Sequence, residues 1–506
     1  MSDTTAGLLL IGFGAHAKRI YYPICRRDGA QFGFNLECVL ELESKRPDVE
    51  HFLRGQNDAV TQVLCLPDDL ARRNELPREA LQPLDQLVRE RHITGVILAT
   101  DPLNHMQYAR WAMQSGLSLL LDKPISTREN IATAPNVAKG LVEDYEELMS
   151  LYRNAPRHQG LPPLVSVMAQ RRYHPMYRRA KELVAEVFTE TNCPVTSIQS
   201  FHADGQWRPP VEILHLDYHP FNRGYGKCSH SGYHFFDLVP WILEAAESRE
   251  KEIDNVDVFA NFLRPSDFAR QLTFIDYNRL FPDYCEYARH NNHELDDKEF
   301  GRIATQLGEI DAFTSLAFKS GDHTLTLGSI NLTHNSFSQR GWLNCEGKDL
   351  YKGNGRLRHE CHIIEQGPFQ ALSLLSFQSR EVDPSNTSGL FDVGGEHHFE
   401  LHVFRNTRMF PKWQPHLSLD LSNRIADRMT GKSRGHQEEA KREAVLEFVR
   451  HLRGDSVSPV SDLATHHRAV QLMSGAYESA VNRLLGENPV VNVGFKAGRG
   501  SDATHS

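Results

Sequence analysis

The chain has 506 residues, of which 40% are hydrophobic and 24% charged, and its formal net charge is -9 at pH 7. This composition is typical of a globular protein with more than one core, and it excludes a chain that is mainly disordered. The acidic balance argues against nucleic acid as the main partner, because nucleic acids are bound by basic surfaces.

The cysteines and the longest apolar runs indicate the redox compartment of the protein and whether it spans a membrane. None of the eight cysteines forms a CxxC pair, which is typical of a protein in a reducing compartment and argues against a disulfide framework. No apolar run approaches the ~20 residues that a membrane-spanning helix requires. We therefore expect a cytoplasmic protein that does not associate with membranes.

Short apolar runs in the first 125 residues predict buried strands. Runs without polar alternation are typical of a parallel sheet that is covered on both faces. Helix-like stretches such as His105–Ser115 separate them, which indicates βαβ units. We predict an α/β fold whose residues 1–155 form a doubly wound Rossmann domain. The predicted strands are Leu8–Gly12, Phe34–Leu40, Gly95–Thr100 and Ser118–Leu121.

A proline-rich segment, Asn154–Pro163, marks a boundary, and the pattern changes beyond it. Stretches such as His323–Thr333 alternate like antiparallel strands with one solvated face. Near the end, Gln437–Leu452 carries Val445, Phe448, Val449 and Leu452 on one helical stripe. We predict a second, α+β domain over 156–490 with an open, mainly antiparallel sheet. It includes an unassigned insertion at about 250–430, and 491–506 form a loose tail.

The first predicted strand runs into the motif Gly12-Phe13-Gly14-Ala15-His16-Ala17, which fits GxGxxG/A. In a dinucleotide-binding turn, the first glycine permits the tight turn and the second lets the backbone approach a pyrophosphate. The small third residue lets helix and strand pack closely. The position directly after a strand and before a helix supports this interpretation over a chance glycine turn.

Glu41 ends the second predicted strand. A carboxylate at this point accepts hydrogen bonds from ribose hydroxyls, which favours NAD. Lys45 and Arg46 follow closely and would suit a 2′-phosphate, so NADP stays open. The alternative is an ordinary solvated acid at the end of a strand.

Three stretches together resemble the glucose–fructose oxidoreductase / inositol dehydrogenase family. They are the glycine turn, Ala99–Ser126 with its closing Asp-Lys-Pro, and Gly232–Trp241, which is similar to the family's G-x-H-x-x-D-x-x-x-W segment. Gln170–Leu183 and Phe448–Ala480 are weaker matches. The resemblance implies an NAD(P)-dependent oxidoreductase acting on a CH–OH group of a sugar, glycoside, nucleotide sugar or inositol. It also implies a homodimer or homotetramer.

The resemblance identifies Lys123 and His234 as a proton relay. Histidine has a reference pKa of roughly 6.5 and exchanges protons near neutrality, while a lysine ammonium stabilises a developing alkoxide. For either residue alone, a structural role would be the ordinary interpretation. The family commonly has Asp where this chain has His230, so His230 is a catalytic or substrate-orienting candidate whose effect on substrate choice is open.

The remaining site predictions also follow from the resemblance. The expected cofactor contacts are Gly12, Gly14, Ala15, His16, Glu41, Thr100, His105, Asp122, Lys123 and Arg172. The expected substrate contacts are Lys123, Tyr173, Trp207, His230, His234 and Asp237. Each has an ordinary alternative, such as a turn threonine, a surface arginine or a helix-surface acid.

A metal ion is not predicted, although His215, Asp217 and His219 would share one face of an extended segment. Three other functions remain open. They are a glycosidase that oxidises and re-reduces its substrate with retained NAD, a non-catalytic dinucleotide-binding sensor, and an imine or keto reductase that prefers NADPH.

Overall fold

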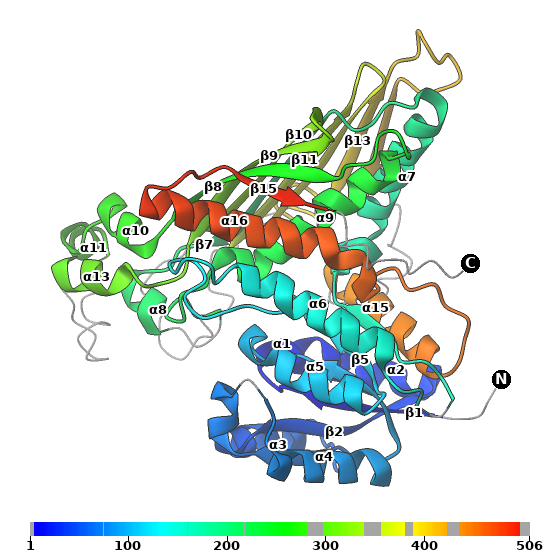
Figure 1. The fold of residues 1–506 in the computed structure, drawn as a ribbon, viewed down its shortest axis with the longest axis vertical. Helices are drawn as coiled ribbons and strands as arrows, with labels where there is room; N and C mark the ends of the chain where they lie inside the picture. The colour runs from blue at the N-terminus through cyan, green and yellow to red at the C-terminus, as the bar shows by residue number, and fades with distance from the viewer. Residues whose placement is uncertain are drawn as a thin grey trace, which may run out of the picture. The chain divides into compact units, whose positions relative to one another are not determined.

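The computed structural model describes residues 5–73, 75–158, 160–215, 219–281, 297–338, 356–379, 388–422 and 435–495 (Figure 1). The chain divides into two compact units. The first contains Met1–Thr127, Leu141–His174 and His436–His467, and the second contains Arg128–Gly140, Pro175–Gly435 and Arg468–Ser506. The segment His436–His467 thus belongs to the first unit, whereas the sequence boundaries placed it in the second domain. Its apolar stripe packs on the first unit's core, which local sequence does not reveal.

The first unit is built on a six-stranded sheet in the order β3-β2-β1-β4-β5-β6, and every pair in it is parallel. All residues of β1 and β5 are buried, as expected for strands covered on both faces. This confirms the predicted doubly wound sheet. The strands are β1 Ala6–Ile11, β2 Phe34–Leu42, β3 Gln62–Leu66, β4 Ile93–Leu98, β5 Ser118–Leu121 and β6 Val165–Val167.

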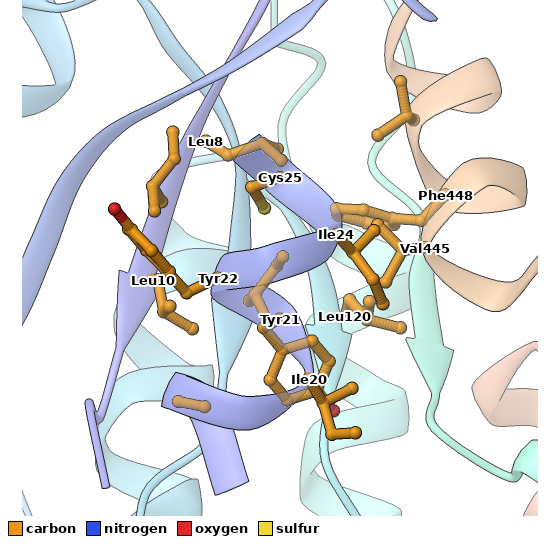
Figure 2. Packing of buried hydrophobic residues seen from close by; sticks show 14 of the residues in the cluster. Leu8, Leu10, Ile20, Tyr21, Tyr22, Ile24, Cys25, Leu120, Val445 and Phe448 are labelled. Carbon is orange, nitrogen blue, oxygen red and sulfur yellow. The ribbon is translucent and has the colours of Figure 1, made fainter. Parts of the chain in front are cut away.

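Helices connect these strands and complete the core of the first unit. Val445 and Phe448 are fully buried in the same apolar cluster as Ile24 and Leu120, and Figure 2 shows them facing one another. The helical stripe predicted near the C-terminus is therefore a core-facing surface. The helices are α1 Ala15–Arg19, α2 Tyr21–Phe32, α3 Arg46–Gly55, α4 Arg78–Glu90, α5 His105–Gln114, α6 Lys139–Asn154 and α15 His436–Leu452.

The second unit is built on a nine-stranded sheet in the order β14-β13-β12-β11-β7-β10-β9-β8-β15. The pair β10–β7 is parallel and the other pairs are antiparallel. This confirms the predicted open, mainly antiparallel sheet. The strands are β7 Ser197–Gln206, β8 Asn255–Leu263, β9 Asp311–Ser320, β10 His323–Asn335, β11 Leu357–Gln366, β12 Gln370–Ser379, β13 Glu400–Arg405, β14 His416–Asp420 and β15 Val491–Gly494.

Long helices line this sheet. They are α7 Pro175–Thr191, α9 Tyr233–Leu243 and α16 His467–Leu485, and α16 runs along β8 and β15 in Figure 1. Gly475 permits that packing, because a Cβ there would lie 2.6 Å from a side-chain atom of Val493 on β15. Burial alternates residue by residue along β12, which is the pattern of a sheet with one covered face.

The region 250–430 is not simply an insertion. It supplies seven strands of the main sheet, from β8 to β14. Its described residues also contribute the short helices α10 Pro265–Gln271, α11 Phe274–Leu280 and α13 Asp297–Ala304. These helices bury Phe268, Tyr277 and Phe300 in an apolar cluster that also contains Ile213 and Phe221. The sequence did not reveal this division because strand pairing depends on partners that are distant in the chain.

Candidate functional site

The glycine turn follows β1 as predicted. Gly12 has a φ of +87°, and a Cβ there would lie 2.8 Å from backbone atoms of Ala99 and Thr100. Only glycine fits such a position. Gly14 caps α1, and a Cβ on it would have no atom within 4 Å among the described residues. The turn thus packs tightly against β4 on one side and leaves open space at its second glycine.

Glu41 holds its carboxylate beside this turn. Its Oε2 accepts a hydrogen bond from the Phe13 N–H at 2.7 Å, and its Oε1 accepts one from the Leu42 N–H at 2.9 Å. The two cationic candidates differ in their surroundings. Arg46 donates two hydrogen bonds to Glu43, at 2.7 and 2.9 Å, and Lys45 is exposed. Of the three candidates, Glu41 is the one bonded to the glycine turn.

The end of β5 carries Asp122 and Lys123. Asp122 Oδ1 accepts the Lys123 N–H at 2.8 Å, and Oδ2 lies 3.4 Å from His16 Nε2. Burial lowers the pKa of His16 well below its usual 6.5, and the nearby cations Lys441, Arg19 and Lys123 lower it further. His16 is therefore neutral at pH 7, and it joins the glycine turn to the predicted Asp-Lys-Pro segment.

His105 connects the loop after β4 to the segment after β5. It is fully buried, with Nδ1 2.9 Å from the Pro124 carbonyl oxygen and Nε2 3.2 Å from the Thr100 carbonyl oxygen. Burial lowers its pKa, and a neutral imidazole donates from one nitrogen only. The ring therefore donates one hydrogen bond, to the backbone of either Pro124 or Thr100, and lies between these two segments.

Arg172 and Tyr173 are also buried in the first unit. Arg172 Nη1 donates to Thr465 Oγ1 at 2.6 Å and to the Val460 carbonyl oxygen at 3.2 Å. The Tyr173 hydroxyl donates to Glu447 Oε1 on α15 at 2.6 Å. These bonds hold the C-terminal segment of the first unit in place. The cofactor and substrate roles expected for the two residues stay predictions.

In the second unit, His230 and His234 lie on consecutive turns of different helical type. Cys228–Gly232 is a π-helix, and α9 begins directly after it at Tyr233. Single π-turns are rare and occur frequently at functional sites. His230 is 4% exposed and His234 is 7% exposed, while Asp237 on α9 is fully buried. The alternative interpretation of Asp237 as a helix-surface acid is therefore wrong.

Aromatic rings surround His230. His219 stacks on it with ring centroids 4.7 Å apart, and Phe221 and Tyr225 approach it edge-on at 5.1 and 5.4 Å. Rings from residues 219–225, just before the π-helix, thus pack against this histidine. Trp207 lies elsewhere, because its ring packs on Phe268 and its Nε1 donates to the Tyr277 hydroxyl at 3.1 Å.

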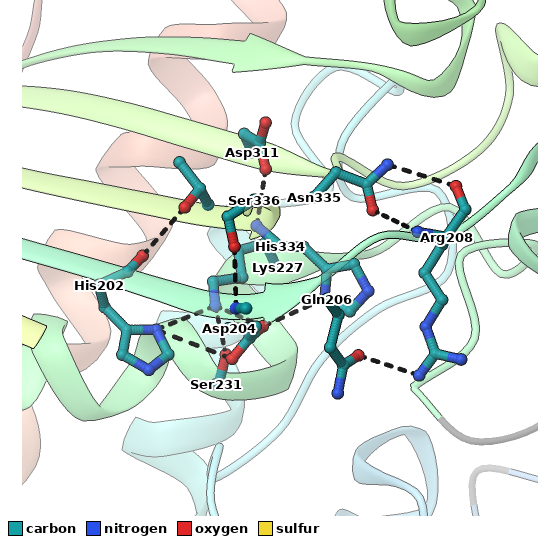
Figure 3. Close-up of polar contacts among 12 residues, drawn as sticks. His202, Asp204, Gln206, Arg208, Lys227, Ser231, Asp311, His334, Asn335 and Ser336 are labelled. Carbon is teal, nitrogen blue, oxygen red and sulfur yellow. Dashed lines mark hydrogen bonds and ion pairs between the residues drawn. The ribbon is translucent and has the colours of Figure 1, made fainter. Parts of the chain in front are cut away.

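A buried polar network anchors the π-helix (Figure 3). Lys227 Nζ donates to Asp204 Oδ2 at 2.6 Å and to Ser231 Oγ at 2.9 Å, and it lies 3.1 Å from His202 Nδ1. Asp204 Oδ2 also lies 3.1 Å from His334 Nδ1. Although burial raises the pKa of Asp204, Lys227 and His334 hold it well below 3.8. Sequence reasoning missed this network because its members come from β7, β10 and the loop before α9.

The described residues contain neither a candidate metal cluster nor a helix that could cross a membrane. No group of three or more His, Cys, Asp or Glu side chains in this part of the chain is placed to hold a metal ion. Asp217, the middle residue of the possible metal triplet, lies outside the described residues. Among the described helices, none has both the length and the hydropathy to cross a membrane.

Comparisons with known proteins place the fold. No protein-family model and no curated protein matches the sequence. Solved structures do match over nearly the whole chain. An oxidoreductase domain protein from Kribbella flavida has a TM-score of 0.55 at 15% identity, covering 98% of this chain and 100% of its own. Levoglucosan dehydrogenase, solved with NADH and levoglucosan, has a TM-score of 0.54 at 13% identity, with coverages of 98% and 100%.

A third similar structure is an oxidoreductase from Agrobacterium radiobacter, solved with NAD+, L-tartaric acid and magnesium. Its TM-score is 0.54 at 13% identity, and the match covers 97% of this chain and 99% of the other. At these identities the likeness concerns the fold. The chain therefore has the two-domain fold shared by these oxidoreductases, with which its sequence resemblance agrees.

Proposed function

We propose that this protein is an NAD-dependent oxidoreductase that transfers a hydride between nicotinamide and a hydroxyl or keto carbon of a sugar or related polyol. The observation that carries the proposal is the glycine turn at the carboxyl edge of a doubly wound sheet, with the Glu41 carboxylate bonded to it at 2.7 Å. Ligands of such sheets bind at that edge. Similar structures solved with NADH and levoglucosan, or with NAD+, support the same conclusion.

The residues of the turn suit a dinucleotide. The open space at Gly14 lets backbone N–H groups approach a pyrophosphate, and the short helix α1 begins there. A carboxylate at the end of β2, such as that of Glu41, accepts from ribose hydroxyls, and its negative charge disfavours a 2′-phosphate. Arg46 is already bonded to Glu43. These features favour NAD over NADP.

The chemistry requires a proton to move with the hydride. When bound, the nicotinamide ring supplies the hydride acceptor or donor. In the oxidation direction, His234 takes the proton of the substrate hydroxyl and returns it in reduction, while the Lys123 ammonium stabilises the alkoxide. His230 orients the substrate. The rings of His219, Phe221 and Tyr225 pack against the His230 imidazole and hold it in position.

The first experiment is thermal unfolding of the purified protein with NAD, NADH, NADP and NADPH, each alone. A ligand at 100 times its Kd adds about 2.7 kcal/mol of stability. We expect a shift with NAD and NADH, and a smaller shift for Glu41→Ala. If no dinucleotide stabilises the protein and none is released on denaturation, the proposal is wrong.

A polyol screen with the preferred cofactor then tests turnover. Lys123→Met and His234→Asn should each lower kcat by about 10²–10⁴-fold while leaving the dinucleotide-induced shift intact. Binding without turnover of any substrate would indicate a sensor. Retained NAD with substrate cleavage and no net redox would indicate a glycosidase.

A further inference from the structure

Lys441 is a buried lysine that the fold itself does not explain. It lies on α15 and is 9% exposed. Among the described residues, Lys441 makes no hydrogen bond and no ion pair. Burial of its side chain disfavours the charged form of the amine unless an anion lies close to it. An anion beside Lys441 would therefore stabilise its ammonium form.

The helical stripe of α15 fixes where Lys441 lies. Residues three, four and seven positions apart share a helix face, and Ala444, Val445 and Phe448 are all fully buried. Lys441 is therefore on the face that packs on the first unit's sheet, at the N-terminal end of the stripe. Helix α15 contacts α2, β4 and β5 of that unit.

The charged groups around Lys441 belong to the cofactor end of the first unit. Burial lowers its pKa well below 10.5, Arg19 and Lys123 lower it further, and Asp122 and Glu438 raise it. The basic side chains of Arg19, Lys123 and Lys441 thus share this region with two carboxylates, and His16 beside them is neutral. An anion bound among these basic groups would favour the charged form of Lys441.

Of the cations near His16, Lys441 has the largest effect on its pKa. His16 is the second residue of α1, directly after Gly14 and Ala15. In doubly wound folds the pyrophosphate of the dinucleotide lies over this turn. The pyridinium ring of NAD+ is itself positive, so it does not satisfy a lysine.

We propose that Lys441 binds a phosphate oxygen of the dinucleotide pyrophosphate, from a helix more than 400 residues beyond the glycine turn. The inference rests on the proposed function, since it assumes that a dinucleotide occupies the turn. It adds a cofactor-binding residue outside the glycine-turn motif and gives the C-terminal helix a role in cofactor affinity.

The test compares Lys441→Met with a matched control on the same helix, Arg442→Met. Arg442 donates to Asp28 at 2.9 Å, so its charge is paired within the protein. We expect Lys441→Met to weaken NAD binding by about 10- to 100-fold, the range of a charge-assisted hydrogen bond, without lowering the Tm of the dinucleotide-free protein. Arg442→Met should do the reverse, lowering that Tm and leaving NAD affinity unchanged.

Fragments of NAD show which part of the dinucleotide Lys441 contacts. Their Kd values are measured by titration calorimetry. ADP-ribose contains the pyrophosphate but no nicotinamide, and adenosine contains neither. Lys441→Met should weaken ADP-ribose binding by the same factor as NAD binding and leave adenosine binding unchanged, and Lys441→Arg should retain most of the affinity. Unchanged NAD affinity in Lys441→Met, or a failure of that variant to fold, overturns the inference.

The control on the proposed function is the wild-type protein. If the wild type binds NAD and Lys441→Met binds it equally well, only the Lys441 assignment fails. If the wild type binds no dinucleotide, the proposed function itself fails. An effect of Lys441→Met confined to the KM of an anionic substrate would assign the lysine to the substrate and overturn the inference.

Discussion

Glu309 is a fully buried carboxyl group of the second unit, and its replacement by glutamine is the most quantitative test of the structure. Its Oε1 accepts hydrogen bonds from the Cys228 N–H at 2.8 Å and from the Tyr477 hydroxyl at 2.9 Å. Its Oε2 has no hydrogen-bond partner among the described residues. Since Cys228 begins the π-helix that carries His230, Glu309 supports the candidate catalytic segment.

The buried position of Glu309 sets the direction and the size of the change in stability with pH. Burial raises the pKa of Glu309 from 4.5 to about 7. The folded state therefore binds more protons than the unfolded state between these values, and its stability falls as pH rises through the window. At about 1.36 kcal/mol per pKa unit, ionising Glu309 costs about 3 kcal/mol of stability by pH 8. Below pH 4.5 this cost is absent.

The assay is urea unfolding of the wild type and Glu309→Gln at pH 5 and pH 8. Other groups titrate in both proteins, so the difference between the two free energies of unfolding isolates Glu309. We expect the variant to gain about 2–3 kcal/mol relative to the wild type between pH 5 and pH 8. Glutamine keeps an oxygen for both hydrogen bonds, so the gain should appear without loss of the fold.

A matched control is Glu212→Gln, which removes another buried carboxylate. Glu212 is ion-paired with Arg208 at 3.1 Å, so its removal should destabilise the protein at pH 8 because it leaves a buried cation uncompensated. The reasoning about Glu309 is refuted if the free energies of unfolding of the wild type and Glu309→Gln change in parallel with pH.

Three further predictions concern the first unit and the catalytic segment. Gly12→Ala should abolish the NAD-induced shift in Tm and cost about 1–3 kcal/mol from its left-handed backbone alone; an undiminished shift would show that the turn does not hold the dinucleotide. Arg172→Met should lower the Tm of the dinucleotide-free protein by removing at least about 2 kcal/mol of buried hydrogen bonding. An unchanged Tm with weaker NAD binding would instead support a cofactor role for Arg172. His230→Asp should change the ratio of kcat/KM values for two polyols more than it changes the Kd for NAD, and the opposite outcome would place His230 at the cofactor.

Much of the first unit follows from local sequence. The runs that form β1, β4 and β5 are mainly apolar, because both faces of those strands are covered, and β2 has an apolar run from Cys38 to Leu40. The strand β3 was not predicted, since Gln62–Leu66 lies at the sheet edge and only its last residue is buried. Edge strands carry a weaker hydrophobic signal, so their pattern does not separate them from loops.

The sequence of the candidate site was partly informative. The glycine turn, Glu41 and the Asp-Lys-Pro segment were visible because each is a short motif at the end of a strand. His105 was assigned to the cofactor, yet its ring nitrogens face the Pro124 and Thr100 carbonyl oxygens. A sequence motif shows which residues are present. The contacts of the His105 ring depend on how the segments after β4 and β5 come together, which the motif does not show.

By itself, the sequence determined the features that depend on neighbours a few residues apart. These are the glycine turn, the covered parallel strands, the helical stripe of α15 and the alternating strands of the second sheet. Only the tertiary structure decided the pairings between distant segments, such as β7 with β10 and Lys227 with Asp204. It also decided the charge environments of Glu309 and Lys441. The physical reason is that burial removes a group from water and so sets its pKa and its need for a partner, and burial is a property of the whole fold.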